Sequence, residues 1–132
     1  MPVAVGSSGS LGLQGLRVLV AEDNWQVADA LKVSLEQIGM VVAGPVAIPS
    51  KARILAAEHN PDLAIVDVNL TGEMAYDLMD WLHDRGTPVI VISGYEDLPG
   101  SLEKFAAILH KPFTVEALLK AVRRVMGEDR SP

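Results

Sequence analysis

Carboxylate side chains follow two apolar segments of this 132-residue sequence. Asp67 comes directly after the apolar run 63–66, and Glu22 and Asp23 come directly after the run 16–21. A short apolar run rich in β-branched residues is typical of a strand buried on both faces, so each acid is expected at the carboxyl end of a strand. Ligands bind at these strand ends in open α/β sheets. The three carboxylates are therefore candidates for one site.

A hydroxyl and an ammonium group are expected at the same edge. Ser93 ends the apolar run 89–93, and Lys111 follows a short strand expected at 107–109. Carboxylates at close range repel by on the order of several kcal/mol, so the acids need a cation or raised pKa values. Mg²⁺ is the natural candidate because it binds one or two carboxylates together with water and phosphate oxygens. The set predicts phosphoryl transfer to a carboxylate, with Mg²⁺ and the lysine neutralising the phosphoryl oxygens and the hydroxyl donating to one of them.

Alternating strands and helices are expected to position these residues. The predicted strands span 16–21, 40–43, 63–66, 89–93 and 107–109, and the predicted helices span 25–38, 49–59, 74–84, 101–106 and 115–126. This alternation predicts a doubly wound α/β fold, in which helices cover both faces of a five-stranded parallel sheet. Right-handed crossovers give the flavodoxin-like strand order 2-1-3-4-5, which makes the first and third strands neighbours.

Two local patterns refine this prediction. The pair Gly44-Pro45 favours an edge position for the second strand, because proline cannot donate a hydrogen bond to a neighbouring strand. Helical spacing predicts that Met74, Leu78 and Leu82 lie in the core. The acids of the first and third strands are then expected to share one crevice.

Composition limits the possible partners and compartments. A formal net charge of −6 argues against a nucleic-acid or anionic-membrane surface, because such surfaces require clusters of Lys and Arg. Cysteine is absent, which excludes disulfides and thiolate chemistry and favours the cytoplasm. No apolar run reaches the roughly 18 to 20 residues of a membrane helix. The pattern predicts a flexible Gly- and Ser-rich tail over 1–15, one folded domain over 16–127 and a C-terminal tail over 128–132.

The site residues and their spacing resemble the receiver domains of two-component response regulators, the family of the chemotaxis regulator. The resemblance covers about residues 16–127. Its marks are the pair Glu22-Asp23, Asp67 after an apolar strand, Ser93 after VIVI, and Lys111-Pro112-Phe113. Each of these motifs alone is weak evidence for the family. All of them together, each at the expected strand end, are specific for it.

The resemblance implies a role for each candidate residue. Asp67 is implied as the phosphoacceptor, with Ser93 and Lys111 binding the phosphoryl group. Mg²⁺ is implied to be held by the side chains of Glu22, Asp23 and Asp67 and by the backbone carbonyl of Asn69. Asp23 is implied as a direct ligand and Glu22 as a second acid that acts mainly through water. The expected protein is a stand-alone phosphoacceptor, not an enzyme, phosphorylated by a histidine kinase or a histidine phosphotransfer protein and signalling by contact with an unknown protein target.

Within that family, the strings NLTGE and TPVIVISGY resemble the single-domain alphaproteobacterial subgroup with a PFxFATGY-like motif. The positions that fit this motif are Pro88, Ser93, Gly94 and Tyr95, while Val89 and Val91 replace its phenylalanines. The sequence departs from most receivers at Ile108, where the family usually has Tyr or Phe. The span between Ser93 and Lys111 is also short, which leaves little room for a full fourth helix. Both departures concern the usual switch mechanism.

Other interpretations of these residues stay open. A strand-terminal Asp67 is also compatible with a loop or cap residue, Lys111 with a solvated surface lysine, and Ser93 with a turn cap. The string Asp67 to Thr71 is one substitution from the DxDxT signature of haloacid-dehalogenase phosphatases, although its second acid is Asn69 and it lies on the third strand. A pseudo-receiver, which keeps the fold without phosphorylation, is the other alternative. The sequence does not decide the role of Trp25.

Overall fold

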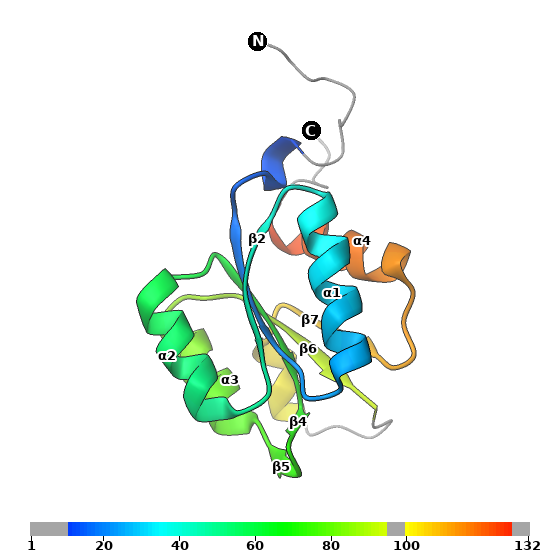
Figure 1. Ribbon diagram of the computed structural model, residues 1–132. Helices are drawn as coiled ribbons and strands as arrows, with labels where there is room; N and C mark the ends of the chain where they lie inside the picture. The colour runs from blue at the N-terminus through cyan, green and yellow to red at the C-terminus, as the bar shows by residue number, and fades with distance from the viewer. Residues whose placement is uncertain (1–10, 95–99, 128–132) are drawn as a thin grey trace.

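A parallel sheet of five strands forms the centre of the molecule (Figure 1). The computed structural model describes residues 11–94 and 100–127. The strands of the sheet are β1 (Arg17–Ala21), β2 (Val41–Val46), β3 (Leu63–Asp67), β6 (Val89–Ser93) and β7 (Ala107–His110). Their spatial order is β2-β1-β3-β6-β7, with every neighbouring pair parallel. This is the predicted order 2-1-3-4-5, so the flavodoxin-like prediction is confirmed.

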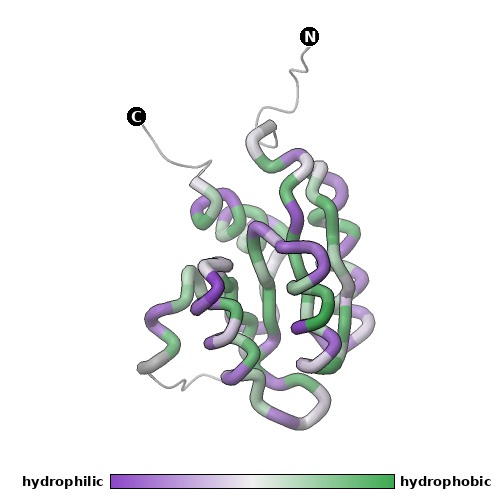
Figure 2. The backbone as a smooth tube through the Cα atoms, turned by 90° about the vertical axis from the view of Figure 1, so that its left-hand side faces the viewer, coloured by the Kyte–Doolittle hydropathy of each residue, from purple (hydrophilic) through white to green (hydrophobic). Residues whose placement is uncertain are grey.

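The described residues form four α-helices, which cover the two faces of the sheet in pairs (Figure 1). They are α1 (Trp25–Gln37), α2 (Pro49–His59), α3 (Tyr76–Asp84) and α4 (Val115–Val125). One hydrophobic cluster joins the sheet to α2 and α3, and a second joins the opposite face to α1 and α4. Every residue of β3 and β6 is buried, as expected for strands covered on both sides. Figure 2 shows mostly hydrophobic strands in the middle and alternating hydrophilic and hydrophobic segments along the helices.

Side-chain caps fix where α1 and α4 begin. The Asn24 side chain accepts hydrogen bonds from the backbone N–H groups of Gln26 and Val27, which starts α1 directly after the acidic pair. The Thr114 hydroxyl likewise accepts from the N–H of Ala117 and starts α4. Such caps satisfy backbone donors that have no partner within a helix. The first helix is thus set at a fixed distance from the end of β1.

A small hairpin replaces the predicted start of the third helix. Strands β4 (Asn69–Leu70) and β5 (Glu73–Met74) pair in antiparallel fashion, so α3 begins at Tyr76 instead of residue 74. The Met74 side chain is exposed, and its predicted place in the core is therefore wrong. Leu78 and Leu82 are buried as predicted.

Two further boundaries differ from the sequence prediction. The edge strand β2 continues through Gly44-Pro45 to Val46, although it keeps the predicted edge position. The 3-10 helix η1 (Leu11–Leu13) carries the fully buried Leu13, so packed residues begin inside the segment predicted as a tail over 1–15. Residues 1–10 and 128–132 of the two predicted tails lie outside the described residues.

The connection between β6 and β7 contains a short 3-10 helix. This helix, η2 (Gly100–Lys104), lies where a short helix was predicted over 101–106. Residues 95–99 lie outside the described residues. In the parts of the chain that are described, no helix has both the length and the apolar character needed to cross a membrane.

Candidate functional site

The carboxyl ends of β1 and β3 bring the predicted acids together. The two strands are neighbours in the sheet, with Ala21 opposite Val66, so Glu22 and Asp67 follow at the same level. The carboxylates of Glu22, Asp23 and Asp67 each offer an oxygen that lies within 4.8 Å of the other two. Strand order therefore brings Asp67 to two adjacent acids that lie more than 40 positions earlier in the sequence.

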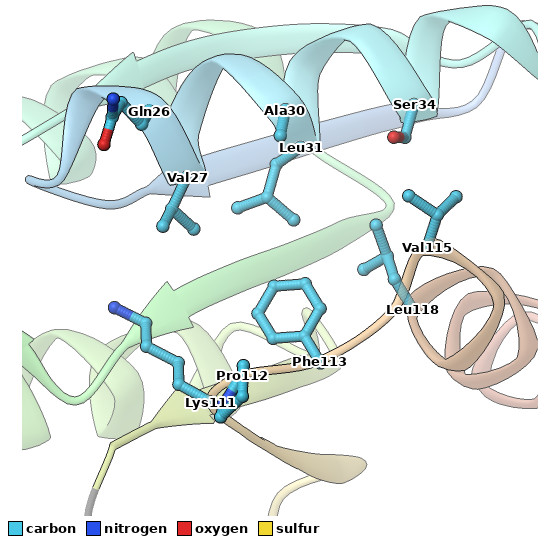
Figure 3. A pocket seen from close by; sticks show the side chains of 10 residues that line it. All are labelled: Gln26, Val27, Ala30, Leu31, Ser34, Lys111, Pro112, Phe113, Val115 and Leu118. Atoms are coloured by element: carbon cyan, nitrogen blue, oxygen red, sulfur yellow. The ribbon is translucent and has the colours of Figure 1, made fainter.

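Lys111 places its ammonium group inside this acidic cluster. Its Nζ atom lies 2.5 Å from Oδ2 of Asp67 and 3.2 Å from Oε1 of Glu22. The backbone N–H of Lys111 donates to the Ser93 carbonyl over 2.7 Å, which fixes the start of this segment against the end of β6. Figure 3 shows the lysine side chain extending away from Pro112 and Phe113. The predicted lysine is thus an ion-pair partner of two acids and not a solvated surface residue.

Ser93 occupies the end of the strand next to β3. Asp67 is opposite Ile92 in the register of β3 and β6, and Ser93 follows one residue later. The side chain of Ser93 is fully buried. The predicted hydroxyl is therefore at the same edge of the sheet as the phosphoacceptor candidate.

The negative charge of Glu22 is unfavourable in the folded state. Burial raises its pKa from an ordinary value of 4.5 to about 7, and the nearby Asp67 charge adds to the rise. The hydrogen bond from the Asn24 N–H and the charge of Lys111 oppose the rise without cancelling it. Among the described residues, Oε1 of Glu22 accepts no hydrogen bond, although Lys111 lies within ion-pair distance. A buried carboxylate oxygen that accepts no hydrogen bond has room to bind a further donor or a cation.

The lysine keeps its proton in this environment. Burial by itself would lower the pKa of Lys111, but the hydrogen bond to Asp67 and the charges of Glu22 and Asp67 outweigh burial and raise the pKa. Lys111 is therefore a cation at neutral pH. Its single positive charge is shared between two carboxylates.

The β4–β5 hairpin supplies backbone donors to the other acid oxygens. The N–H of Asn69 donates to Oδ1 of Asp67 over 2.8 Å, and the N–H of Thr71 donates to Oδ2 of Asp23 over 2.9 Å. Sequence reasoning missed Thr71, because no local pattern places its N–H beside Asp23, which lies 48 positions earlier in the sequence. The adjacent Gly72 was the one local signal for a tight turn.

The donor set fits Mg²⁺. Three carboxylates within 4.8 Å of one another, one of them with a buried oxygen that accepts no hydrogen bond, provide the hard oxygen ligands that Mg²⁺ prefers. Glu22 and Asp23 also line a cavity of about 370 Å³ that is bordered by Trp25. That tryptophan is 74% exposed, which places it beside the acids and in contact with solvent.

Comparison with known proteins agrees with this geometry. The family model described as "Response regulator receiver domain" matches residues 18–123. The transcriptional regulatory protein PhoP of Escherichia coli strain K12 is 31% identical over 117 residues, which cover 84% of this chain and 52% of PhoP. The C4-dicarboxylate transport transcriptional regulatory protein DctD of Pseudomonas aeruginosa is 29% identical over 118 residues, which cover 83% of this chain and 25% of DctD. The chain thus spans about half of PhoP and a quarter of DctD.

Solved structures support the same fold. The PhyR response regulator REC domain from Erythrobacter litoralis has a TM-score of 0.78 and 24% sequence identity, covering 90% of this chain and 95% of that domain. At this identity the likeness is evidence for the fold alone. The family model covers most of the chain, and the acids and lysine that mark the family meet at one edge of the sheet. The chain therefore belongs to the response regulator receiver domain family.

Proposed function

We propose that Asp67 is the phosphoacceptor of this receiver domain and that its phosphorylation requires Mg²⁺. The observation that carries the proposal is the position of Lys111, whose Nζ atom lies 2.5 Å from Oδ2 of Asp67 inside the acidic cluster. The histidine kinase or histidine phosphotransfer protein expected as partner would supply the phosphoryl group from a phosphohistidine.

The transfer step uses one oxygen of Asp67 as the nucleophile. This oxygen attacks phosphorus, an O–P bond forms, and the P–N bond to the donor imidazole breaks with its electron pair returning to the ring nitrogen. Lys111 is placed to bind a phosphoryl oxygen because its ammonium already lies against Asp67. The buried Ser93 hydroxyl is the candidate donor to a second phosphoryl oxygen.

Glu22, Asp23, Asp67 and the Asn69 carbonyl are the groups that would hold Mg²⁺. When bound, the ion supplies the positive charge that offsets the carboxylates and the incoming phosphoryl oxygens. The pKa of Glu22 raised by burial and its oxygen without a hydrogen bond support a cation at this position.

We infer three finer features from the family and the sequence. The output is contact with a protein target, the compartment is the cytoplasm, and the subgroup is the alphaproteobacterial one with the PFxFATGY-like motif. Support for the subgroup comes from Pro88, which directly precedes β6, and from Ser93, which ends it. Tyr95 of the motif lies outside the described residues.

Intact-mass measurement after incubation with acetyl phosphate tests the proposal. We expect the wild type to gain one phosphate mass with Mg²⁺ and none with EDTA, and we expect Asp67→Asn to gain none under either condition. The asparagine keeps the shape of the side chain and replaces the carboxylate nucleophile with a neutral amide. Equal labelling of wild type and Asp67→Asn would contradict the assignment of the phosphoacceptor.

Two further measurements separate the alternatives. Absent Mg²⁺ binding, together with no labelling, would favour the pseudo-receiver. Sustained turnover of p-nitrophenyl phosphate that depends on Asp67 would favour the haloacid-dehalogenase type of phosphatase.

A further inference from the structure

The turn of the β4–β5 hairpin has an unusual backbone for its sequence. Its two central residues, Thr71 and Gly72, have φ angles of +50° and +85°. A two-residue hairpin turn with both φ angles positive favours Asn, Asp and Gly, and a β-branched residue there is an outlier. Contacts outside the turn must therefore stabilise this conformation of Thr71.

One such contact reaches a candidate metal ligand. The N–H of Thr71 donates to Oδ2 of Asp23, which is 48 positions earlier in the sequence. The side chain of Asp23 is exposed, so without a partner it would be distributed over several rotamers in water. When one oxygen of the Asp23 carboxylate accepts a hydrogen bond, the direction in which its other oxygen points is fixed as well. The turn thus orients Asp23 before a cation arrives.

The side chain of Asn69 holds the turn in place. Its Oδ1 atom accepts a hydrogen bond from the Gly72 N–H over 3.1 Å, while its own backbone N–H donates to Asp67. Asn69 therefore connects the phosphoacceptor candidate to the turn that contacts Asp23. This use of the carboxamide is separate from the metal contact that the family implies for the Asn69 carbonyl.

We propose that Asn69 is a positioning residue for the cation site, because its carboxamide holds the 71–72 turn so that the Thr71 N–H orients Asp23. The inference rests on the proposed Mg²⁺ site at these acids. Hydrogen-bond partners of metal ligands typically change metal affinity by 10- to 100-fold when they are removed. We expect the lower end of this range, about tenfold, because the variant removes a partner of the turn and not the ligand.

Two substitutions perturb the turn in different ways. Asn69→Ala removes the acceptor for the Gly72 N–H, whereas Asn69→Ser retains a shorter acceptor and should recover part of the affinity. Gly72→Ala opposes the positive φ alone, since a Cβ atom added at Gly72 would meet no atom within 4 Å. We expect Gly72→Ala to weaken Mg²⁺ binding severalfold.

The chain offers a matched control for each variant. Asn60 is another asparagine whose Oδ1 accepts one hydrogen bond, from Arg85 over 3.3 Å, but it precedes β3 at the opposite end of the strand. Gly86 has the same φ of +85° as Gly72 and equally open surroundings, and it follows α3. We expect Asn60→Ala and Gly86→Ala to bind Mg²⁺ within twofold of the wild type.

Titration calorimetry with Mg²⁺ measures the affinity, and amide exchange of Thr71 reports the hydrogen bond directly. We expect Asn69→Ala to show weaker binding together with faster exchange at Thr71, a pair of changes that a general loss of stability would not confine to this residue. Urea unfolding in EDTA identifies any variant that is partly unfolded, and Gly72→Ala then provides the independent result. If the wild type binds Mg²⁺ and both Asn69→Ala and Gly72→Ala bind it with unchanged affinity, the inference about Asn69 is wrong but the proposed Mg²⁺ site stands. If the wild type binds no Mg²⁺, the proposed site itself is wrong.

Discussion

Replacing Glu22 with glutamine should stabilise the metal-free protein at alkaline pH. Glu22 is buried, lies beside Asp67 and has a pKa raised to about 7 by burial first and by the Asp67 charge in addition. A glutamine at this position has nearly the same shape and still offers an oxygen to the Asn24 N–H, which now donates to Oε2 of Glu22. Glu22→Gln therefore removes the buried charge and keeps the cap of α1.

The sign and size of the effect follow from the pKa values. A carboxyl group with a raised pKa in the folded state stabilises the fold fully below its unfolded pKa of about 4.5, and this contribution is lost as the pH rises through about 7. Between pH 5.5 and pH 8.5 the loss is about 2 kcal/mol. Over this pH range the unfolding free energy of the wild type should fall by this amount relative to that of Glu22→Gln, because the glutamine has no proton to release.

Urea unfolding in EDTA at several pH values measures the difference between the two proteins. Other titrating groups contribute nearly equally to both, so the difference in unfolding free energy isolates Glu22. We expect Glu22→Gln to gain about 2 kcal/mol on the wild type from pH 5.5 to pH 8.5. A difference that stays constant over this range, or that changes in the opposite direction, would refute the argument that burial destabilises the Glu22 charge.

Three further predictions concern the lysine, the lifetime of the phosphorylated state and the switch. Lys111→Ala should destabilise the metal-free protein by on the order of 2 kcal/mol in urea unfolding. The effect should be smaller at pH 5.5, because Glu22 takes up a proton there, and an effect independent of pH would show that the ion pairs matter little. Tyr95→Ala should lose the phosphoryl group a few times faster than the wild type by intact mass, because the sequence places this large side chain two residues after Ser93, where it could keep water from the acyl phosphate. An unchanged rate of loss would show that Tyr95 does not shield the acyl phosphate. Mg²⁺ with beryllofluoride should raise amide-exchange protection most over 94–106, and Ile108→Val should show the same rise. A rise in protection that is centred on Ile108 and lost in Ile108→Val would show that strand β7 carries the switch.

The strands and the acidic cluster could be predicted because they depend on local patterns and one topological rule. Short β-branched runs identify the strands, and each site acid directly follows such a run. Right-handed crossovers then make β1 and β3 neighbours, which brings Asp67 to Glu22 and Asp23. The sequence could not distinguish the burial of the two adjacent acids, since the fully buried side chain of Glu22 and the exposed Asp23 differ only through packing.

The β4–β5 hairpin could not be predicted because its stabilising contacts are distant in sequence. Local propensity disfavours a positive φ at Thr71, and the partner of its N–H lies 48 positions away. The helical spacing of Met74 with Leu78 then suggested a longer helix, although the hairpin leaves Met74 exposed. The buried Leu13 was missed for a similar reason, because Gly and Ser around it indicated only a tail.

The contacts of Asp67 connect the site to two separate surface segments. Oδ2 of Asp67 contacts Lys111, and the residues after this lysine line a groove of about 460 Å³ against α1, where Figure 3 shows Val27 and Leu31 pointing toward Phe113. Oδ1 of Asp67 accepts from Asn69, whose hairpin borders α2 and α3 on the other side. A phosphoryl group on Asp67 must change at least one of these contacts, because an oxygen that carries phosphorus cannot keep the full charge that Lys111 now pairs with. A modification shifts a conformational equilibrium only through contacts that differ between two states. At least one of the two segments therefore meets this condition, and neither segment requires an aromatic side chain at residue 108.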